Sequence, residues 1–167
     1  MKTVRVFTHH EYPREAAELY LKNDVIAVGF VYDENVAKNG NENIIKKSMR
    51  KRWPLNTKGQ IDNAASHFLK FRDKIEKGNL ILAYEGKNIV SAIGTVIGEC
   101  EFNNNNIIGN YDGMISYPNQ RRVKWEIHPR FFTRWELNPE IIHWVALRGT
   151  VYIKETPKIS RIDDLVP

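Results

Sequence analysis

The stretch NLILAYEGKNIVSAIGTVIGECEF, residues 79–102, decides the fold. It contains two apolar runs, Leu80–Tyr84 and Ile89–Glu101, separated by the polar turn EGKN. Two such runs joined by a short turn predict a β-hairpin. Gly94 and Gly98 interrupt the second run, which indicates a bend in the strand or a close approach by another backbone. We therefore expect a curved, mainly antiparallel sheet built around this hairpin.

Downstream, the stretch NQRRVKWEIHP (119–129) alternates apolar and polar residues. Strict alternation predicts a half-buried strand, because successive side chains point to opposite faces. Trp125 lies on the apolar face, and the pattern leaves open whether it is a core residue, the floor of a pocket or a stacking surface. A short helix near Pro139–Leu147 and a last strand in TVYIKE follow, and residues 156–167 are predicted to be a C-terminal tail or linker.

Upstream, strands and helices are interleaved. The pattern predicts a strand at Val4–Phe7, a helix from Pro13 to about Asn23, a buried strand at Val25–Tyr32, a helix at 42–53 ended by Pro54, and a helix from about Asp62 to Lys77. Asp62 or Asn63 is the expected N-cap of the last helix, and the polar segment 33–43 reads as turns. This order predicts an α+β fold, with a bent barrel of about five to six strands and helices packed around it, forming one domain over residues 1–155.

The composition indicates a globular protein. Of the 167 residues, 42% are hydrophobic, and no apolar run approaches the roughly 18 residues that a membrane helix needs. The N-terminal residues lack the apolar region of a signal peptide, so we expect a cytoplasmic protein. Cys100 is the single cysteine, which excludes an internal disulfide and a zinc site built on cysteines.

Sequence motifs of enzymes are absent. The GKN of EGKN is not a phosphate-binding loop, because Ile81 stands where that motif requires glycine. His9 and His10 are adjacent at a strand end, so their side chains would diverge and bind no common metal. We therefore expect a binding module that has no catalytic residues, no cofactor and no metal.

The positive charge is clustered. The chain carries a net charge of +5, and two groups of cations stand out: Lys46, Lys47, Arg50, Lys51 and Arg52, and then Arg121, Arg122, Lys124, Arg130 and Arg134. Four tryptophans and seven tyrosines accompany them. Aromatic rings can stack on unpaired bases while cations hold the phosphates, so this combination favours a nucleic-acid partner.

Four stretches, taken in order, resemble the EVE branch of the PUA-like superfamily, which is related to the YTH readers of methylated adenine. They are VIAVGF (25–30), IIKKSMRKRWP (44–54), the long segment 63–99 and RRVKW (121–125). The greatest similarity is to modules that precede McrB-type modification-dependent restriction GTPases, and it covers about residues 3–128. The resemblance implies a bent barrel with a pocket at one end, where an aromatic cage receives a modified base flipped out of its duplex.

The resemblance also implies that Phe30, Asn63, Tyr111, Tyr117 and Trp125 belong to the base pocket and that Arg121 and Arg122 bind phosphate. The interleaved aromatic and basic residues add Tyr32 to the expected base pocket, and add Lys47, Arg50, Lys51 and Lys124 to the expected phosphate contacts. Phe30 stands where relatives often have tryptophan, which makes one wall of the cage smaller. Asn63 matches an asparagine that leads a helix in the family, and either an N-cap or a base contact would explain it.

Three functions follow as alternatives. The first is a specificity module that recognises methylated or otherwise modified bases in double-stranded DNA, within a restriction system that also has a GTPase motor and a nuclease subunit. The second is an RNA-binding PUA-like domain. The third is a small enzyme acting on nucleotides or amides. Three measurements would distinguish these functions: binding to modified duplexes, binding to RNA, and turnover of nucleosides.

Overall fold

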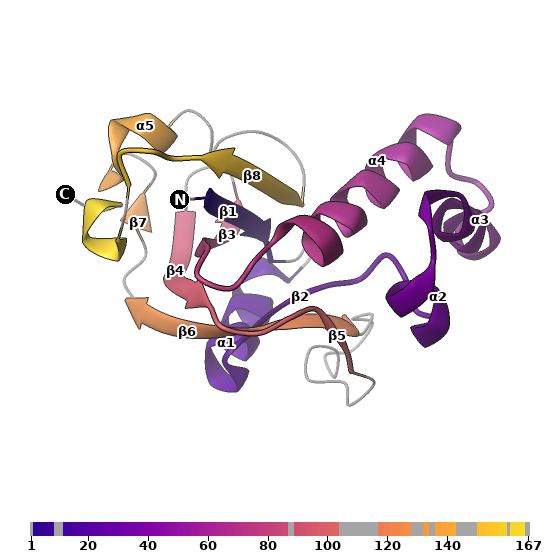
Figure 1. Cartoon of the computed structure of the whole chain (residues 1–167), viewed down its shortest axis with the longest axis horizontal. Coiled ribbons are helices and arrows are strands. Elements are labelled where there is room, and N and C mark those ends of the chain that lie inside the picture. The colour runs from indigo at the N-terminus through magenta and orange to yellow at the C-terminus, as the bar shows by residue number, and fades with distance from the viewer. Residues whose placement is uncertain are drawn as a thin grey trace.

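The computed structural model describes residues 2–8, 12–86, 89–103, 117–127, 132–133, 136–142, 150–159 and 161–165. Over these residues the fold is α+β, with a curled mixed sheet and helices packed on it (Figure 1). The strands are β1 (Lys2–Phe7), β2 (Val25–Val28), β3 (Leu80–Gly86), β4 (Ile89–Val96), β5 (Glu101–Phe102), β6 (Asn119–Ile127), β7 (Phe132–Thr133) and β8 (Val151–Glu155). Their order is β2-β6-β4-β3-β1-β8, with β5 paired to β6 and β7 paired to β4.

The predicted hairpin forms the centre of the sheet. β3 and β4 pair antiparallel, with Leu82 opposite Ile93, and the register shifts after Ala83. β4 also pairs with β6, and this register shifts at Gly94. A Cβ added to Gly94 would lie 2.6 Å from the Lys124 carbonyl oxygen, so a side chain is excluded there. The predicted close approach at this glycine is therefore confirmed.

β6 shows the predicted alternation of exposed and buried side chains. Arg121, Val123 and Trp125 are buried, whereas Arg122 and Lys124 are exposed. The alternation places Arg121 on the apolar face, because it differs from Val123 by two positions. β1 runs parallel to β3 and antiparallel to β8, which makes the sheet mixed.

The helices are α1 (Pro13–Asn23), α2 (Glu34–Asn39), α3 (Glu42–Arg52), α4 (Lys58–Leu69) and α5 (Pro139–Ile142), and a π-helical turn, Lys70–Lys74, continues α4. α1 packs on β2, β3 and β4. Helices α2 and α3 and the beginning of α4 lie at one end of the molecule, on the right in Figure 1, and α5 and β7 lie at the opposite end.

Two helices differ from the sequence prediction. α4 begins at Lys58 and not near Asp62, because Thr57 and Gln60 form a reciprocal capping box that satisfies the first backbone N–H groups. α2 occupies part of the segment predicted as turns. The Asp33 carboxylate accepts a hydrogen bond from the Val36 N–H at 2.9 Å, which caps this short helix.

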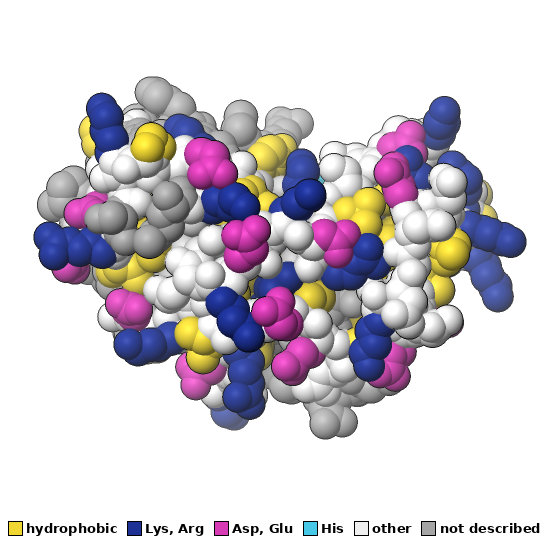
Figure 2. Space-filling model, viewed as in Figure 1, with side chains coloured by type: hydrophobic (Ala, Val, Ile, Leu, Met, Phe, Trp, Pro, Cys, Tyr) yellow, Lys and Arg dark blue, Asp and Glu magenta, His cyan; other side chains and the backbone are white. Residues whose placement is uncertain are grey.

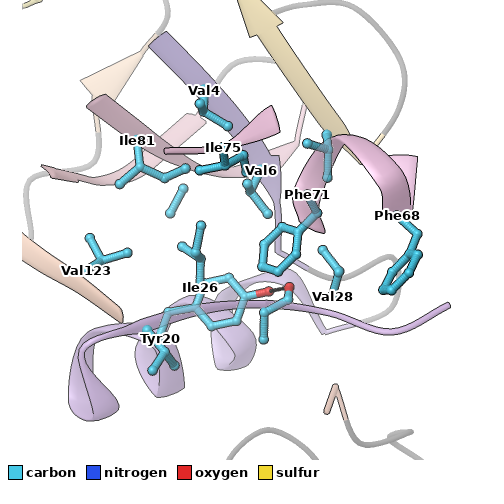
Figure 3. Packing of buried hydrophobic residues seen from close by; sticks show 14 of the residues in the cluster. Val4, Val6, Tyr20, Ile26, Val28, Phe68, Phe71, Ile75, Ile81 and Val123 are labelled. Carbon is cyan, nitrogen blue, oxygen red and sulfur yellow. Dashed lines mark hydrogen bonds between the residues drawn. The ribbon is translucent and has the colours of Figure 1, made fainter. Parts of the chain in front are cut away.

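The main core lies inside the curl of the sheet, where α1, α4 and the π-helical turn cover it (Figure 3). Phe68 and Phe71 are fully buried there, and each contributes about 1.5–3 kcal/mol by leaving water. Tyr20 is also fully buried, and its hydroxyl donates to the Ala27 carbonyl oxygen at 2.5 Å. Burial of this phenol raises its pKa well above the ordinary value.

The last residues correct the predicted boundary at residue 156. Ile159, Ile162 and Leu165 are buried against Leu82 and Ile93 in a second apolar cluster. The Asn138 amide also donates to the Asp164 carbonyl oxygen at 3.0 Å, which ties this segment to the body of the protein. The segment is thus part of the domain and not a solvated tail.

Within the described ranges, every helix is too short or too polar to cross a bilayer.

Candidate functional site

The loop after β2 contains an unusual backbone conformation. The Val31 N–H donates to the Gly29 carbonyl oxygen at 2.9 Å, which closes a three-residue γ-turn with Phe30 at its centre. Phe30 has a φ of 69°, in the left-handed region that bulky residues avoid. Strain of this kind costs about 1–3 kcal/mol and is concentrated at binding and catalytic sites. The turn presents the half-buried ring of Phe30 just beyond the end of β2.

Asn119 holds this turn in place. Its side-chain amide nitrogen lies 3.3 Å from the Val28 carbonyl oxygen, 2.9 Å from that of Gly29 and 2.8 Å from that of Val31. The side chain is 1% exposed, so these hydrogen bonds form away from water, where an unmade bond is costly. The first residue of β6 therefore fixes the loop that follows β2.

Two tyrosines close around the same turn. A Cβ added to Gly29 would lie 2.5 Å from the Tyr32 hydroxyl oxygen and 3.2 Å from the Tyr117 ring. The Tyr32 hydroxyl and the Tyr117 ring therefore both approach the backbone at Gly29, where a larger residue would push them away. Phe30 follows Gly29 in the chain, and we call Phe30, Tyr32 and Tyr117 the aromatic cluster because all three lie at this turn, with partly exposed side chains.

The aromatic cluster is joined to α3 through Tyr32. The Arg52 guanidinium carbon lies 3.8 Å from the centroid of the Tyr32 ring, and the Trp53 ring meets it edge-on at a centroid distance of 6.5 Å. A cation over a ring face is attracted by the ring quadrupole. Burial raises the pKa of Tyr32 to about 12, against the opposing effect of Arg52, so the hydroxyl stays protonated at neutral pH.

The outer face of α3 is strongly cationic. Lys47, Arg50 and Lys51 are exposed, and none of them forms an ion pair with another described residue. Lys46, by contrast, pairs with Glu42 on its own helix and lies 2.9 Å from the Asp62 carboxylate on α4. Figure 2 shows Lys and Arg side chains projecting from the end of the molecule where Figure 1 places α3. This face can bind an extended anion.

Arg121, which the sequence predicts to bind phosphate, is instead a structural residue. It is 2% exposed and donates to three carbonyl oxygens: Phe71 at 2.9 Å, Arg72 at 2.6 Å and Gly98 at 3.2 Å. Burial lowers its pKa. The guanidinium satisfies carbonyl groups of the π-helical turn, so it is directed into the protein and away from any phosphate.

Arg72 extends this connection to α2. Its guanidinium donates to the Ala37 carbonyl oxygen at 3.2 Å and to that of Gly40 at 2.8 Å, and it pairs with Asp73 through two hydrogen bonds. These contacts satisfy carbonyl groups at the end of α2. Arg121 and Arg72 together fix α2 and the π-helical turn relative to β6.

Trp125 lies apart from the aromatic cluster. It is 6% exposed, and its indole N–H donates to the Tyr20 carbonyl oxygen at 3.1 Å. Phe30 follows the end of β2 that pairs with Asn119, whereas Trp125 lies six residues further along β6, about 20 Å away in an extended strand. The prediction that Trp125 shares a pocket with Phe30 is therefore wrong.

Trp125 instead borders a different pocket, of about 310 Å³. The pocket is lined by Asn23, Asp24, Ile97, Arg122, Val123, Lys124 and Trp125. Arg122 and Lys124 are exposed there, as the alternation on β6 requires, so these two predicted phosphate ligands are available to solvent.

The remaining predicted pocket residues have other positions. Asn63 is exposed on α4 and is not its N-cap, which is Thr57. Tyr111 lies outside the described residues. Of the six predicted pocket residues, Tyr32 and Tyr117 approach the turn at Gly29, and Phe30 lies at the centre of that turn.

Two residues of the site are missing from the sequence prediction. Arg52 belongs to a predicted basic cluster, but its contact with the Tyr32 ring depends on how α3 docks. Asn119 clamps the γ-turn from a position 88 residues after Val31, which no local pattern reveals. Its only signal is a polar side chain at the start of an otherwise regular strand.

Comparison with known proteins places the chain in a family. No curated protein matches the chain. The family model described as "Domain of unknown function (DUF8426)" matches residues 7–138, a range that contains the aromatic cluster, α3 and β6. The chain therefore belongs to the DUF8426 family, a domain of unknown function.

Proposed function

We propose that the chain is a non-catalytic DNA-binding module with a PUA-like, EVE-type fold. It recognises a modified, methylated base that is flipped out of double-stranded DNA, as the specificity part of a cytoplasmic restriction system with a GTPase motor and a nuclease subunit. The observation that carries the proposal is the γ-turn at Phe30. A strained backbone clamped by Asn119 presents the Phe30 ring next to Gly29, which the Tyr32 hydroxyl and the Tyr117 ring approach, and Tyr32 contacts the cationic helix α3.

The aromatic cluster supplies the stacking energy. Extruding a base costs a few kcal/mol, and stacking on a ring returns about 1–3 kcal/mol per base. A methyl group adds apolar contact with the rings of Phe30 and Tyr117. The Tyr32 hydroxyl, whose pKa of about 12 keeps it protonated, provides a hydrogen-bond donor at the same place.

The cations of α3 supply affinity that does not depend on sequence. Lys47, Arg50 and Lys51 are exposed and form no ion pair with the described carboxylates, so they are available to phosphates. Each phosphate contact releases counterions and makes binding weaker as salt rises. Arg122 and Lys124 border the separate pocket beside Trp125, where they would hold another part of the DNA.

The test is a fluorescence-anisotropy titration with duplexes that contain 5-methylcytosine, N6-methyladenine or no modification, beside RNA of the same sequence. Phe30→Ala should reduce the preference for one modified duplex over the unmodified one by about tenfold, since it removes a stacking partner. Lys47→Ala should weaken binding to every duplex alike and reduce the slope of log K against log salt by about 0.9.

Three results would reject the proposal. Equal affinity of the unaltered protein for all duplexes would show that it does not recognise a modified base. Tighter binding to RNA would favour an RNA-binding PUA-like domain. Turnover of nucleosides by the isolated chain would indicate an enzyme. Asn63→Ala is the matched control, because this exposed side chain lies outside the aromatic cluster and should leave every affinity unchanged.

A further inference from the structure

Leu55 is the most exposed large apolar side chain among the described residues. It is 97% exposed, compared with 51% for Ile97 and 47% for Ile44. Single exposed leucines are common on protein surfaces and need no explanation by themselves. The surroundings of Leu55 are different, because it stands at the tip of the turn that joins the cationic helix α3 to α4.

The turn that carries Leu55 is held at both ends. On one side the Trp53 N–H donates to the Met49 carbonyl oxygen at 2.8 Å and the Asn56 N–H donates to the Trp53 carbonyl oxygen at 3.2 Å. On the other side Thr57 begins the capping box of α4. Pro54 restricts the backbone between them. The leucine is therefore presented on a pre-ordered backbone, which lowers the entropic cost of binding.

The turn also adjoins the aromatic cluster. Arg52 and Trp53 both contact the Tyr32 ring, and Leu55 is two residues beyond Trp53. Two residues of chain span about 7 Å at most. The exposed leucine and the ring proposed to receive the base thus belong to neighbouring parts of one surface.

The charge around Leu55 indicates its partner. Residues 42–62 contain six cations and two carboxylates, Glu42 and Asp62. Both carboxylates are held by Lys46, so the outer face remains cationic. The partner must therefore be a polyanion that accepts one apolar side chain. A DNA duplex meets both requirements, because it is a polyanion and apolar side chains such as leucine insert between its base steps.

We propose that Leu55 is the wedge that enters the base stack and occupies the space left by the extruded base. This inference rests on the proposed function, since it takes the same DNA duplex as the partner. The wedge stabilises the opened duplex, and the cations of α3 hold the flanking phosphates while the base reaches the aromatic cluster.

The test compares two duplexes that lack any modification: one intact, and one with a single tetrahydrofuran abasic site. The gap in the abasic duplex admits the wedge without unstacking a base. The unaltered protein should bind the abasic duplex at least about tenfold more tightly than the intact one, because only the intact duplex must first open a base step. Leu55→Ala should bring the two affinities within about twofold of each other, and Leu55→Met, which keeps an apolar wedge, should retain the preference.

The controls separate this inference from the proposed function. Ile89→Ala removes another exposed apolar side chain, 40% exposed and on β4, and should behave like the unaltered protein. Phe30→Ala should keep the preference for the abasic duplex, because no base enters the pocket. The leucine is almost fully exposed, so Leu55→Ala should fold normally, as circular dichroism would verify.

If Leu55→Ala matches the unaltered protein on both duplexes while Phe30→Ala still loses its preference for a modified base, the wedge is wrong and the proposed function stands. If the unaltered protein binds no duplex, the wedge proposal and the proposed function are both wrong. Loss of binding to anionic phospholipid vesicles on Leu55→Ala, with DNA binding unchanged, would also overturn the wedge and assign the leucine to a membrane surface.

Discussion

At the scale of single residues, Arg121 and Arg122 show how one position along a strand reverses the role of a side chain. Both are arginines in β6, but Arg121 points into the protein and satisfies three carbonyl groups, whereas Arg122 is exposed beside a pocket. The alternation that predicts the strand also predicts this difference, since Arg121 shares its face with Val123. The resemblance to other proteins treats the two arginines alike, and the structure separates them.

Replacing each of these two arginines with methionine should reveal their different contributions to stability. Arg121→Met leaves three carbonyl groups without their donor, so we expect a loss of about 2–4 kcal/mol in the free energy of unfolding. Arg122→Met should change it by less than about 0.5 kcal/mol, as surface substitutions do. Urea denaturation of both variants measures this, and equal losses would contradict the structural role of Arg121.

At the scale of elements, the two most informative glycines are Gly94 in β4 and Gly59 in α4. A Cβ at Gly94 would meet the Lys124 carbonyl oxygen at 2.6 Å and the Trp125 ring at 2.9 Å. A Cβ at Gly59 would meet nothing within 4 Å. The first glycine permits β4 and β6 to approach each other, and the second only weakens a helix.

Alanine should therefore have opposite effects at the two positions. In Gly94→Ala the added methyl group pushes the Lys124 backbone and the Trp125 ring away from β4, and we expect a destabilisation of about 1–3 kcal/mol. Gly59→Ala should stabilise the protein by about 0.5 kcal/mol, because alanine loses less backbone entropy in a helix. Thermal unfolding of the two variants tests this; a stable Gly94→Ala variant would mean that the strands can separate without cost.

The elements that the sequence predicts well are those with a strong local pattern. The hairpin, α1, α3 and β6 follow from apolar periodicity and from Pro13 and Pro54. The prediction places the beginning of α4 too late, because the capping residue Thr57 precedes a first turn with no apolar residue until Ile61. The prediction does not include α2, since its six polar-rich residues carry little helical signal and depend on contacts with Asp33 and Arg72.

The candidate site is less predictable than the elements, for a physical reason. The positive φ of Phe30 depends on Asn119, which is remote in the sequence, and no local propensity favours that conformation for phenylalanine. The prediction of the six pocket residues depends on their aromatic or polar character and on the resemblance, neither of which gives their positions in space. Trp125 was grouped with Phe30 although strand pairing places the two at opposite ends of β2, a fact that only the register reveals.

At the scale of the whole molecule, the buried phenols should make folding sensitive to alkali. In the unfolded chain Tyr32 loses its proton near its ordinary pKa of 10, whereas burial raises its folded pKa to about 12. The unfolded state then binds fewer protons between these values. The contribution of the Tyr32 phenol to the free energy of unfolding is therefore fully present below pH 10 and is lost as the pH rises towards 12. Tyr20, whose pKa is also raised by burial, acts in the same direction.

Urea denaturation at pH 8 and at pH 11 measures the effect. The free energy of unfolding should fall over this interval, and Tyr32→Phe, which cannot ionise, should reduce the fall by about 1 kcal/mol. Tyr152→Phe is the control, because it removes a half-buried phenol outside the aromatic cluster. A variant with an unchanged alkaline profile would show that the Tyr32 phenol is in contact with water.

The position of β1 has a consequence for biosynthesis. This strand precedes the other seven described strands in the sequence, yet it lies between β3 and β8, and Val6 pairs with Val151, which is 145 residues later. One edge of β1 therefore stays unpaired during synthesis until β8 has emerged from the ribosome. A nascent chain in this condition invites chaperones that shield open strand edges, and synthesis stalled before β8 would leave an aggregation-prone intermediate.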